Sequence, residues 1–196
     1  MIARAFLCAL SAVLLGACAS ALPEHFYSLT SDAVTPTTAA SNAAFSITIE
    51  RITVPELVDR PQIVLSTGDH QVKLMEGHRW AESLRQAIPR QVADNLRRQF
   101  PRASIATVSD STVNAQASYR LAMDIVRFDS RLDDGVDIAV HWRLRNAAGV
   151  VVEQVSNIHE KSIDVGYDAL VAAHGKALVR LSNEIATAIP AAHIGR

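Results

Sequence analysis

Segment 135–146 (GVDIAVHWRLRN) alternates apolar and polar side chains over its whole length, and this pattern constrains the fold more than any other in the chain. Its apolar positions are Val136, Ile138, Val140, Trp142 and Leu144. Alternation with a period of two residues is typical of a strand that buries one face. Similar runs at 118–128 and 150–163 flank it across short turn segments at 129–135 and 146–149. The sequence therefore predicts an antiparallel meander of three strands.

Shorter strand patterns precede the meander. The segment FSITIERITV (45–54) places alternate apolar residues on one face, as a half-buried strand should. Segment 61–75 contains two β-rich runs on either side of the sequence TGDH, which predicts a hairpin. A further short strand is expected at 104–108.

Two segments have helical periodicity. In 78–102 an apolar residue recurs every four positions, at Trp80, Leu84, Ile88, Val92 and Leu96. Pro89 lies inside this stripe without shifting its register, so we expect one kinked helix, which Pro101 ends. Segment 167–189 has a second apolar face and is expected to end at Pro190. This order of elements predicts an α+β domain, a largely antiparallel sheet covered on one face by two long helices.

The first 17 residues have the pattern of an export signal. Arg4 supplies a positive charge, and the apolar run AFLCALSAVLLGA (5–17) is too short to span a bilayer comfortably. The sequence Leu15-Gly16-Ala17-Cys18 resembles the bacterial lipobox, whose cysteine becomes the first residue of the mature protein. We therefore predict a cleaved lipoprotein signal peptide at 1–17 and covalent lipid, with palmitate, on Cys18. The alternative is an ordinary secretory signal in which Cys18 has no role.

The sequence after Cys18 predicts one anchored domain. HFYSL (25–29) is a candidate short strand that docks on the body, and the Thr- and Ala-rich segment 29–44 indicates a flexible tether. We assign 18–44 to the lipidated N-terminus, short strand and tether, and 45–196 to a single α+β domain. About 25 flexible residues would give this domain a reach of roughly 25–30 Å.

Charge and cysteine content exclude several classes of protein. The formal net charge of −1 gives no indication of a nucleic-acid partner. Cys8 leaves with the signal peptide, so the mature chain cannot form an internal disulfide bond. No apolar run after Cys18 reaches the length of a membrane-spanning helix, and the lipid is therefore the expected membrane attachment.

Motifs that carry catalysis are not evident in the sequence. The chain lacks a phosphate-binding loop, a G-x-S-x-G nucleophile elbow and an H-E-x-x-H zinc motif. His174 is expected to be solvated or hydrogen-bonded rather than a metal ligand, and Asp133, Asp134 and Asp137 to form a polar turn rather than a calcium loop. We therefore predict a non-enzymatic protein with no catalytic residue, no metal and no cofactor besides the lipid on Cys18.

The segment 52–84 (ITVPELVDRPQIVLSTGDHQVKLMEGHRWAESL) resembles the ABC-type transport auxiliary lipoprotein family of the PqiC type. The matching residues are Pro55, Leu57, Asp59, Arg60, Pro61, Gln62, Ile63, Val64, Trp80, Ala81 and Leu84. The resemblance continues through FYSL, YRLAMDIVRF, the tryptophan strand that ends in Asn-Ala-Ala-Gly, and the helix at 167–189. It spans nearly the whole mature chain in order.

This resemblance implies a component of an ABC- and MCE-type system that moves phospholipid or another hydrophobic compound between membranes. The implied role is to dock on or cap the conduit of an MCE-domain protein, with an ABC permease and ATPase as further partners, and a homo-oligomeric ring is one form it could take. Ala19 stands where inner-membrane lipoproteins usually carry aspartate, which favours the periplasmic face of the outer membrane. The alternatives are a lipid carrier with its own apolar cavity, a structural envelope lipoprotein, and a periplasmic hydrolase with a nucleophile–base pair in a pocket.

Within the resembling segment, VPELVDRP is a candidate contact surface for a partner or another subunit. Its two prolines stiffen the backbone, and its candidate contact residues are Pro55, Leu57, Asp59, Arg60 and Pro61. Arg60 could bind a carboxylate of the neighbouring molecule through two hydrogen bonds. The alternative is that Asp59 and Arg60 make internal contacts that shape the loop. Trp80 is expected in the core rather than at an interface.

Overall fold

The predicted meander forms the larger part of a five-stranded sheet. Strands β6 (Tyr119–Arg131), β7 (Gly135–Asn146) and β8 (Gly149–Lys161) pair antiparallel, with Met123 opposite Trp142 and Trp142 opposite Gln154. The computed structural model describes residues 23–30, 44–68, 70–108 and 117–194, with side chains to residue 189. The meander prediction is confirmed, because a two-residue period and short turns leave few other ways to pair these strands.

Two short strands extend this sheet beyond β6. Strand β2 (Ser46–Ile49) pairs parallel with β6 and also with β5 (Ser104–Thr107), which gives the strand order β5-β2-β6-β7-β8. The predicted strand at 45–54 is shorter than expected, and its last part makes only an isolated bridge between Thr53 and Asp124. The sheet is therefore mixed, because the chain returns through a helix before β5 and so re-enters in the same direction as β2.

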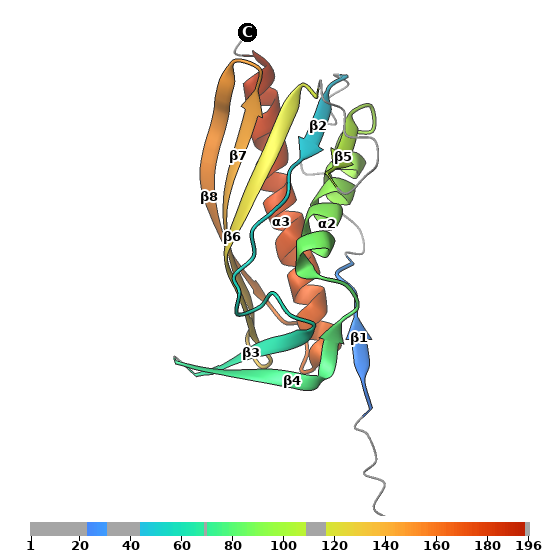
Figure 1. Ribbon diagram of the computed structural model, residues 1–196, viewed down its shortest axis with the longest axis vertical. Coiled ribbons are helices and arrows are strands. Elements are labelled where there is room, and N and C mark those ends of the chain that lie inside the picture. The colour runs from blue at the N-terminus through green and yellow to red at the C-terminus, as the bar shows by residue number, and fades with distance from the viewer. Residues whose placement is uncertain (1–22, 31–43, 69, 109–116, 195–196) are drawn as a thin grey trace, which may run out of the picture.

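The predicted hairpin belongs to a second, smaller sheet at one end of the molecule. Strands β3 (Gln62–Gly68) and β4 (Gln71–Trp80) pair antiparallel, and β1 (His25–Tyr27) adds to β4 in parallel. Figure 1 shows this sheet crossing the end of the longer strands. Trp80 is the last residue of β4, so its predicted place in a helical stripe is wrong. The four-residue interval between Trp80 and Leu84 runs from the end of a strand to the start of a helix.

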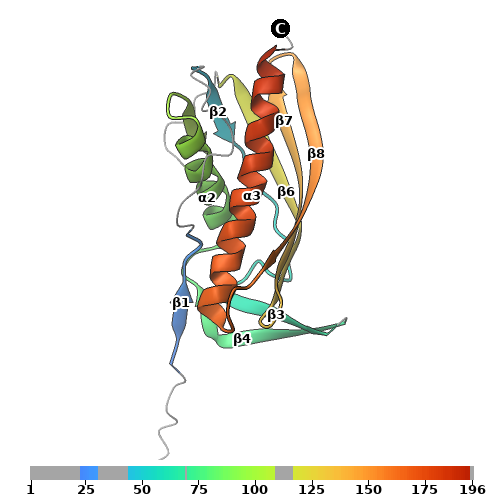
Figure 2. The ribbon, with the colours of Figure 1, turned by 180° about the vertical axis from the view of Figure 1, so that it is seen from behind.

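Two helices cover one face of the larger sheet. Helix α2 (Leu84–Gln99) continues through Pro89, and α3 (Tyr167–Ile194) packs against β7, β8 and α2. Figure 2 shows both helices in front of the sheet. The α+β prediction is thus confirmed. The predicted end of the second helix at Pro190 is wrong, since a proline removes one backbone donor but does not end a helix whose flanking turns continue.

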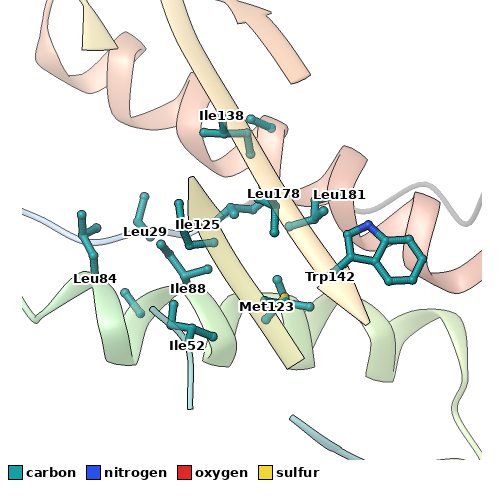
Figure 3. Close-up of a cluster of buried hydrophobic side chains, with 14 of the residues drawn as sticks. Leu29, Ile52, Leu84, Ile88, Met123, Ile125, Ile138, Trp142, Leu178 and Leu181 are labelled. Atoms are coloured by element: carbon teal, nitrogen blue, oxygen red, sulfur yellow. The ribbon is translucent and has the colours of Figure 1, made fainter. Parts of the chain in front are cut away.

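The core lies between these helices and the inner face of the larger sheet. Figure 3 shows Ile88 from α2, Leu178 and Leu181 from α3, and Met123 and Trp142 from the sheet in one cluster. All of these side chains are at most 1% exposed. The opposite face of the sheet carries polar pairs, such as the ion pair Arg143–Asp124 at 3.6 Å and the His141–Glu153 contact at 2.8 Å. Such exposed pairs stabilise little, so the helix-covered face provides most of the stability.

The tight turn between β6 and β7 depends on a glycine. Gly135 has a φ angle of +134°, and a Cβ atom there would lie 2.2 Å from the carbonyl oxygen of Glu160. Only glycine avoids both the backbone strain and this clash. The position therefore fixes where β7 begins relative to β8.

One histidine is packed entirely inside the core. His174 of α3 is fully buried, stacks on Phe128 with ring centroids 4.3 Å apart, and meets Trp80 edge-on at 5.6 Å. Its Nε2 atom forms a 2.8 Å hydrogen bond with the Ser130 hydroxyl, while its Nδ1 atom has no partner in the described part of the chain. Desolvation lowers the pKa of His174 to about 3, so the imidazole is neutral at physiological pH.

We expect Leu121→Ala to reduce the free energy of unfolding by about 2–5 kcal/mol, because Leu121 is completely buried on β6 and its loss leaves a cavity. Val126→Ala, on the same strand but at a side chain that is 64% exposed, should change it by less than about 0.5 kcal/mol. Urea denaturation followed by circular dichroism measures both values. Similar losses for the two variants would contradict the assignment of the buried face.

Replacing His174 should make the free energy of unfolding depend less steeply on pH below neutrality. The pKa of His174 is about 3 in the folded protein, whereas the ordinary value of 6.5 applies to the unfolded chain. Between pH 6.5 and pH 3 the unfolded chain therefore binds a proton at His174 that the folded protein does not bind. Unfolding is therefore favoured as pH falls, by up to about 1.4 kcal/mol per pH unit from this group. Denaturation of His174→Gln between pH 6 and pH 4 should show a shallower slope than wild type.

Ser130→Ala is the control for this comparison, because it removes the hydrogen-bond partner but keeps the buried imidazole. It should retain the steep slope of the wild type. Equal slopes for wild type and His174→Gln would show that burial of this ring does not control acid stability.

Candidate functional site

The first described strand, β1, attaches the N-terminal part of the chain to the domain. Cys18 lies outside the described residues, but β1 pairs with β4 from His25 onward. The Ala81 amide donates to the Tyr27 carbonyl at 2.8 Å, and Glu24 pairs with Arg79 at 3.1 Å. The chain is thus held by the body from Glu24 on.

This attachment shortens the reach that the sequence predicted. Seven residue steps separate Cys18 from His25, and a fully extended chain covers no more than about 25 Å over that distance. The 25-residue reach does not apply, because the strand within 18–44 is already paired with the domain. Residues 31–43 lie between β1 and β2 and outside the described part of the chain.

Four aromatic rings join β1, β4 and α3 where the chain enters the domain. The His78 ring stacks on Tyr167 with centroids 3.5 Å apart and on His25 at 5.1 Å, and its Nδ1 atom is 2.8 Å from the Tyr27 hydroxyl. Desolvation, and then the nearby His25, lower the pKa of His78. Desolvation, and then the negative charge of Asp168, raise the pKa of the Tyr27 hydroxyl.

These rings act as a clamp on β1 rather than as a metal site. The imidazoles of His25 and His78 lie face to face with an interplanar angle of 12°, whereas metal coordination uses the ring edges. No group of three metal-ligating side chains occurs among the residues that the structure describes. Sequence reasoning missed this clamp, because the three elements are distant in sequence and no pattern within one of them indicates which rings of the others it contacts.

The predicted contact segment forms a rigid turn on the surface. The amides of Val58 and Asp59 both donate to the Pro55 carbonyl, at 3.0 and 3.1 Å, and the Trp80 amide donates to the Pro61 carbonyl at 2.7 Å. Val58 is buried, whereas Leu57 is 44% exposed. The turn is therefore fastened to the domain by its backbone and by Val58, and it presents Leu57 outward.

The two charged residues of this turn have different surroundings. Asp59 accepts a 2.7 Å hydrogen bond from the Arg85 guanidinium at the start of α2, so it does not pair with Arg60. The Nε atom of Arg60 is buried and has no hydrogen-bond partner within the described ranges. The alternative of internal contacts thus holds for Asp59, although its partner is Arg85 and not Arg60.

A serine–histidine pair is present but enclosed. Ser130 and His174 are hydrogen-bonded as a nucleophile and base would be, yet they are only 3% and 0% exposed. A base must be reached by substrate, and a pKa of about 3 makes this imidazole a weak proton acceptor at neutral pH. The pair therefore contributes to packing.

Hollows on the described surface are open and lined by mixed side chains. One of about 650 Å³ lies between β1 and α3, where Phe26 and Val171 face Glu160, Lys176 and Arg180. Another of about 540 Å³ lies between the β3–β4 hairpin and the β6–β7 turn. Both lie outside the packed layer between helices and sheet, where an enclosed acyl chain would have to fit.

The described helices include none with both the length and the apolar composition needed to cross a membrane.

The chain is similar to known transport lipoproteins over most of its length. The sequence profile of the ABC-type transport auxiliary lipoprotein component family matches residues 27–186. Intermembrane transport lipoprotein PqiC of Escherichia coli (strain K12) is 24% identical over 169 residues, which cover 86% of this chain and 88% of that protein. PqiC of Shigella flexneri has the same identity and coverage.

Solved structures share the fold. The crystal structure of an uncharacterized protein superposes with a TM-score of 0.71 at 21% identity, covering 85% of this chain and 99% of that one. A Xanthomonas campestris protein gives a TM-score of 0.68 at 19% identity, covering 83% and 92%. At these identities the superpositions show the fold alone, whereas the profile match shows the family. The chain belongs to the ABC-type transport auxiliary lipoprotein family and is an auxiliary lipoprotein component of a transport system.

Proposed function

We propose that this protein is held by lipid on Cys18 at the periplasmic face of the outer membrane and docks on or caps the MCE-domain conduit of an ABC-type lipid transport system. The observation that carries the proposal is a lipobox cysteine only seven residue steps before the first strand of a transport-auxiliary domain. Lipid held this close to the body keeps the domain next to any membrane-bound partner and raises their effective concentration. Ala19, in place of the aspartate usual in inner-membrane lipoproteins, is consistent with location at the outer membrane, as the resemblance implied.

A docking role suits the chemistry of the domain better than a carrier role. The space between helices and sheet is filled by fully buried side chains such as Ile88, Met123 and Leu178. The hollow beside β1 is lined partly by charged groups, which an acyl chain would desolvate without compensation. The cargo therefore passes through the partner, and this protein supplies a rigid contact surface, either as one copy or as a ring of copies.

We propose the turn at 55–61 as that contact surface. Leu57 supplies exposed apolar area, and half-buried Arg60, whose Nε atom has no hydrogen-bond partner in the described part of the chain, supplies the candidate guanidinium donor. Asp59 is engaged by Arg85 and holds the shape of the turn. A carboxylate on the MCE-domain partner or on a neighbouring copy would accept hydrogen bonds from the Arg60 guanidinium.

Cys18→Ser should abolish incorporation of radiolabelled palmitate and move the protein from the membrane fraction to the soluble periplasmic fraction. Lipobox processing attaches diacylglycerol to the cysteine sulfur through a thioether, so the modification needs the thiol. Fractionation with immunoblotting measures the second effect. Equal palmitate incorporation in wild type and variant would refute the anchor.

Arg60→Ala should weaken capture of the MCE-domain partner in a native-membrane pull-down by at least about tenfold, because truncation leaves the partner carboxylate unpaired. Leu57→Ser should weaken it less. Arg102→Ala is the matched control, since this exposed arginine follows α2 at the opposite end from Asp59 and Arg85. Unchanged capture by Arg60→Ala would remove this turn from the interface.

A further inference from the structure

The most exposed large apolar side chains of the described residues lie side by side in one loop. Val165 is 79% exposed and Ile163 is 78% exposed, and both belong to the 162–166 loop between β8 and α3. Single exposed apolar residues are ordinary on protein surfaces. Two that occupy the same short loop and make almost no contact with the body suggest a surface that another phase or molecule covers.

Hydrogen bonds hold the loop in the shape that exposes these side chains. The Ser162 hydroxyl donates to the Asp164 carbonyl at 2.7 Å, and the Val165 amide donates to the Asp164 carboxylate at 2.7 Å. The Ser162 amide donates to the Asp134 carbonyl at 3.2 Å, which fastens the loop to the β6–β7 turn. Exposure of Ile163 and Val165 is thus a property of a built turn.

The loop lies at the end of the molecule where the N-terminal chain enters. The residue after the loop, Tyr167, stacks on His78 and lies 6.0 Å from the Tyr27 ring of β1. Figures 1 and 2 show β1, the β3–β4 hairpin and the start of α3 together at this end, opposite the C-terminal end of α3. Phe26 of β1 adds a further apolar side chain there, 62% exposed.

The length of chain before β1 identifies the occupant. If lipid on Cys18 sits in the bilayer, His25 lies within about 25 Å of it, and the 162–166 loop belongs to the end of the domain that this short connection holds against the membrane. We propose that the 162–166 loop inserts Ile163 and Val165 into the interfacial layer of the bilayer. The inference rests on the proposed lipid anchor at Cys18. It adds a second attachment that sets the orientation of the domain.

The charges around the loop fit insertion driven by apolar burial. Lys161 stands beside the loop, and Asp164 is already bonded to the loop backbone. Arg131 pairs with Asp137 at 2.6 Å and lies 3.6 Å from Asp134. No positive excess results from these groups, so contact with the membrane does not depend on a high content of anionic lipid.

Depth-dependent quenching on the full-length lipidated protein tests this inference. Cys8 is predicted to leave with the signal peptide and the Cys18 sulfur to carry lipid, so Ile163→Cys or Val165→Cys provides a single reactive thiol. Each variant is labelled with an environment-sensitive fluorophore in vesicles of phosphatidylethanolamine and phosphatidylglycerol that contain brominated lipid. Val150→Cys is the matched control, because Val150 is 55% exposed at the opposite end of β8.

Labels at 163 and 165 should be quenched at least about twofold more strongly than the label at 150, because only they enter the acyl boundary. Equal, weak quenching at all three positions overturns the inference. A label that is immobilised but not quenched assigns the loop to another protein copy and also overturns it. Mass spectrometry of the same samples separates the two proposals: lipid on Cys18 with unquenched labels refutes only the loop insertion, whereas absence of the lipid refutes both.

Discussion

Burial of two helix faces against one face of a sheet is the constraint on which the other features of this domain depend. Both cysteines precede residue 19, so the described domain has no disulfide bond to stabilise it. Its stability must come from the layer of buried apolar side chains between α2, α3 and the inner face of the larger sheet. The outer face of the sheet can then remain polar, and its ion pairs serve solubility more than stability.

The same packed layer leaves functional groups only at the edges of the domain. His174 and Ser130 are enclosed by aromatic rings, so a pair that resembles part of a catalytic triad has no access to substrate. Among the exposed large apolar side chains of the described residues, three lie on turns: Leu57 before β3, and Ile163 and Val165 before α3. A rigid body with binding surfaces on its turns suits an auxiliary component that positions other proteins.

Pairing of β1 with β4 links the domain to the proposed lipid anchor at Cys18. Without it, the first 27 residues of the mature chain would form one long tether and the domain could take many orientations. The aromatic clamp of Tyr27, His78 and Tyr167 fastens β1 to α3, and it does so a few residues from the lipobox cysteine. The strand and the 162–166 loop therefore lie at the same end of the molecule, next to the proposed anchor.

The sequence by itself determined the elements with strong periodicity and the export signal pattern at the N-terminus. The meander followed from alternation in 135–146, and the α+β class followed from adding two amphipathic helices, because local periodicity decides which face each element must bury. Tertiary structure alone decided that Trp80 ends a strand, that β2 and β5 pair in parallel, and that Asp59 binds Arg85. These outcomes depend on contacts between residues far apart in the chain, and a pattern within one segment carries no information about its distant partners.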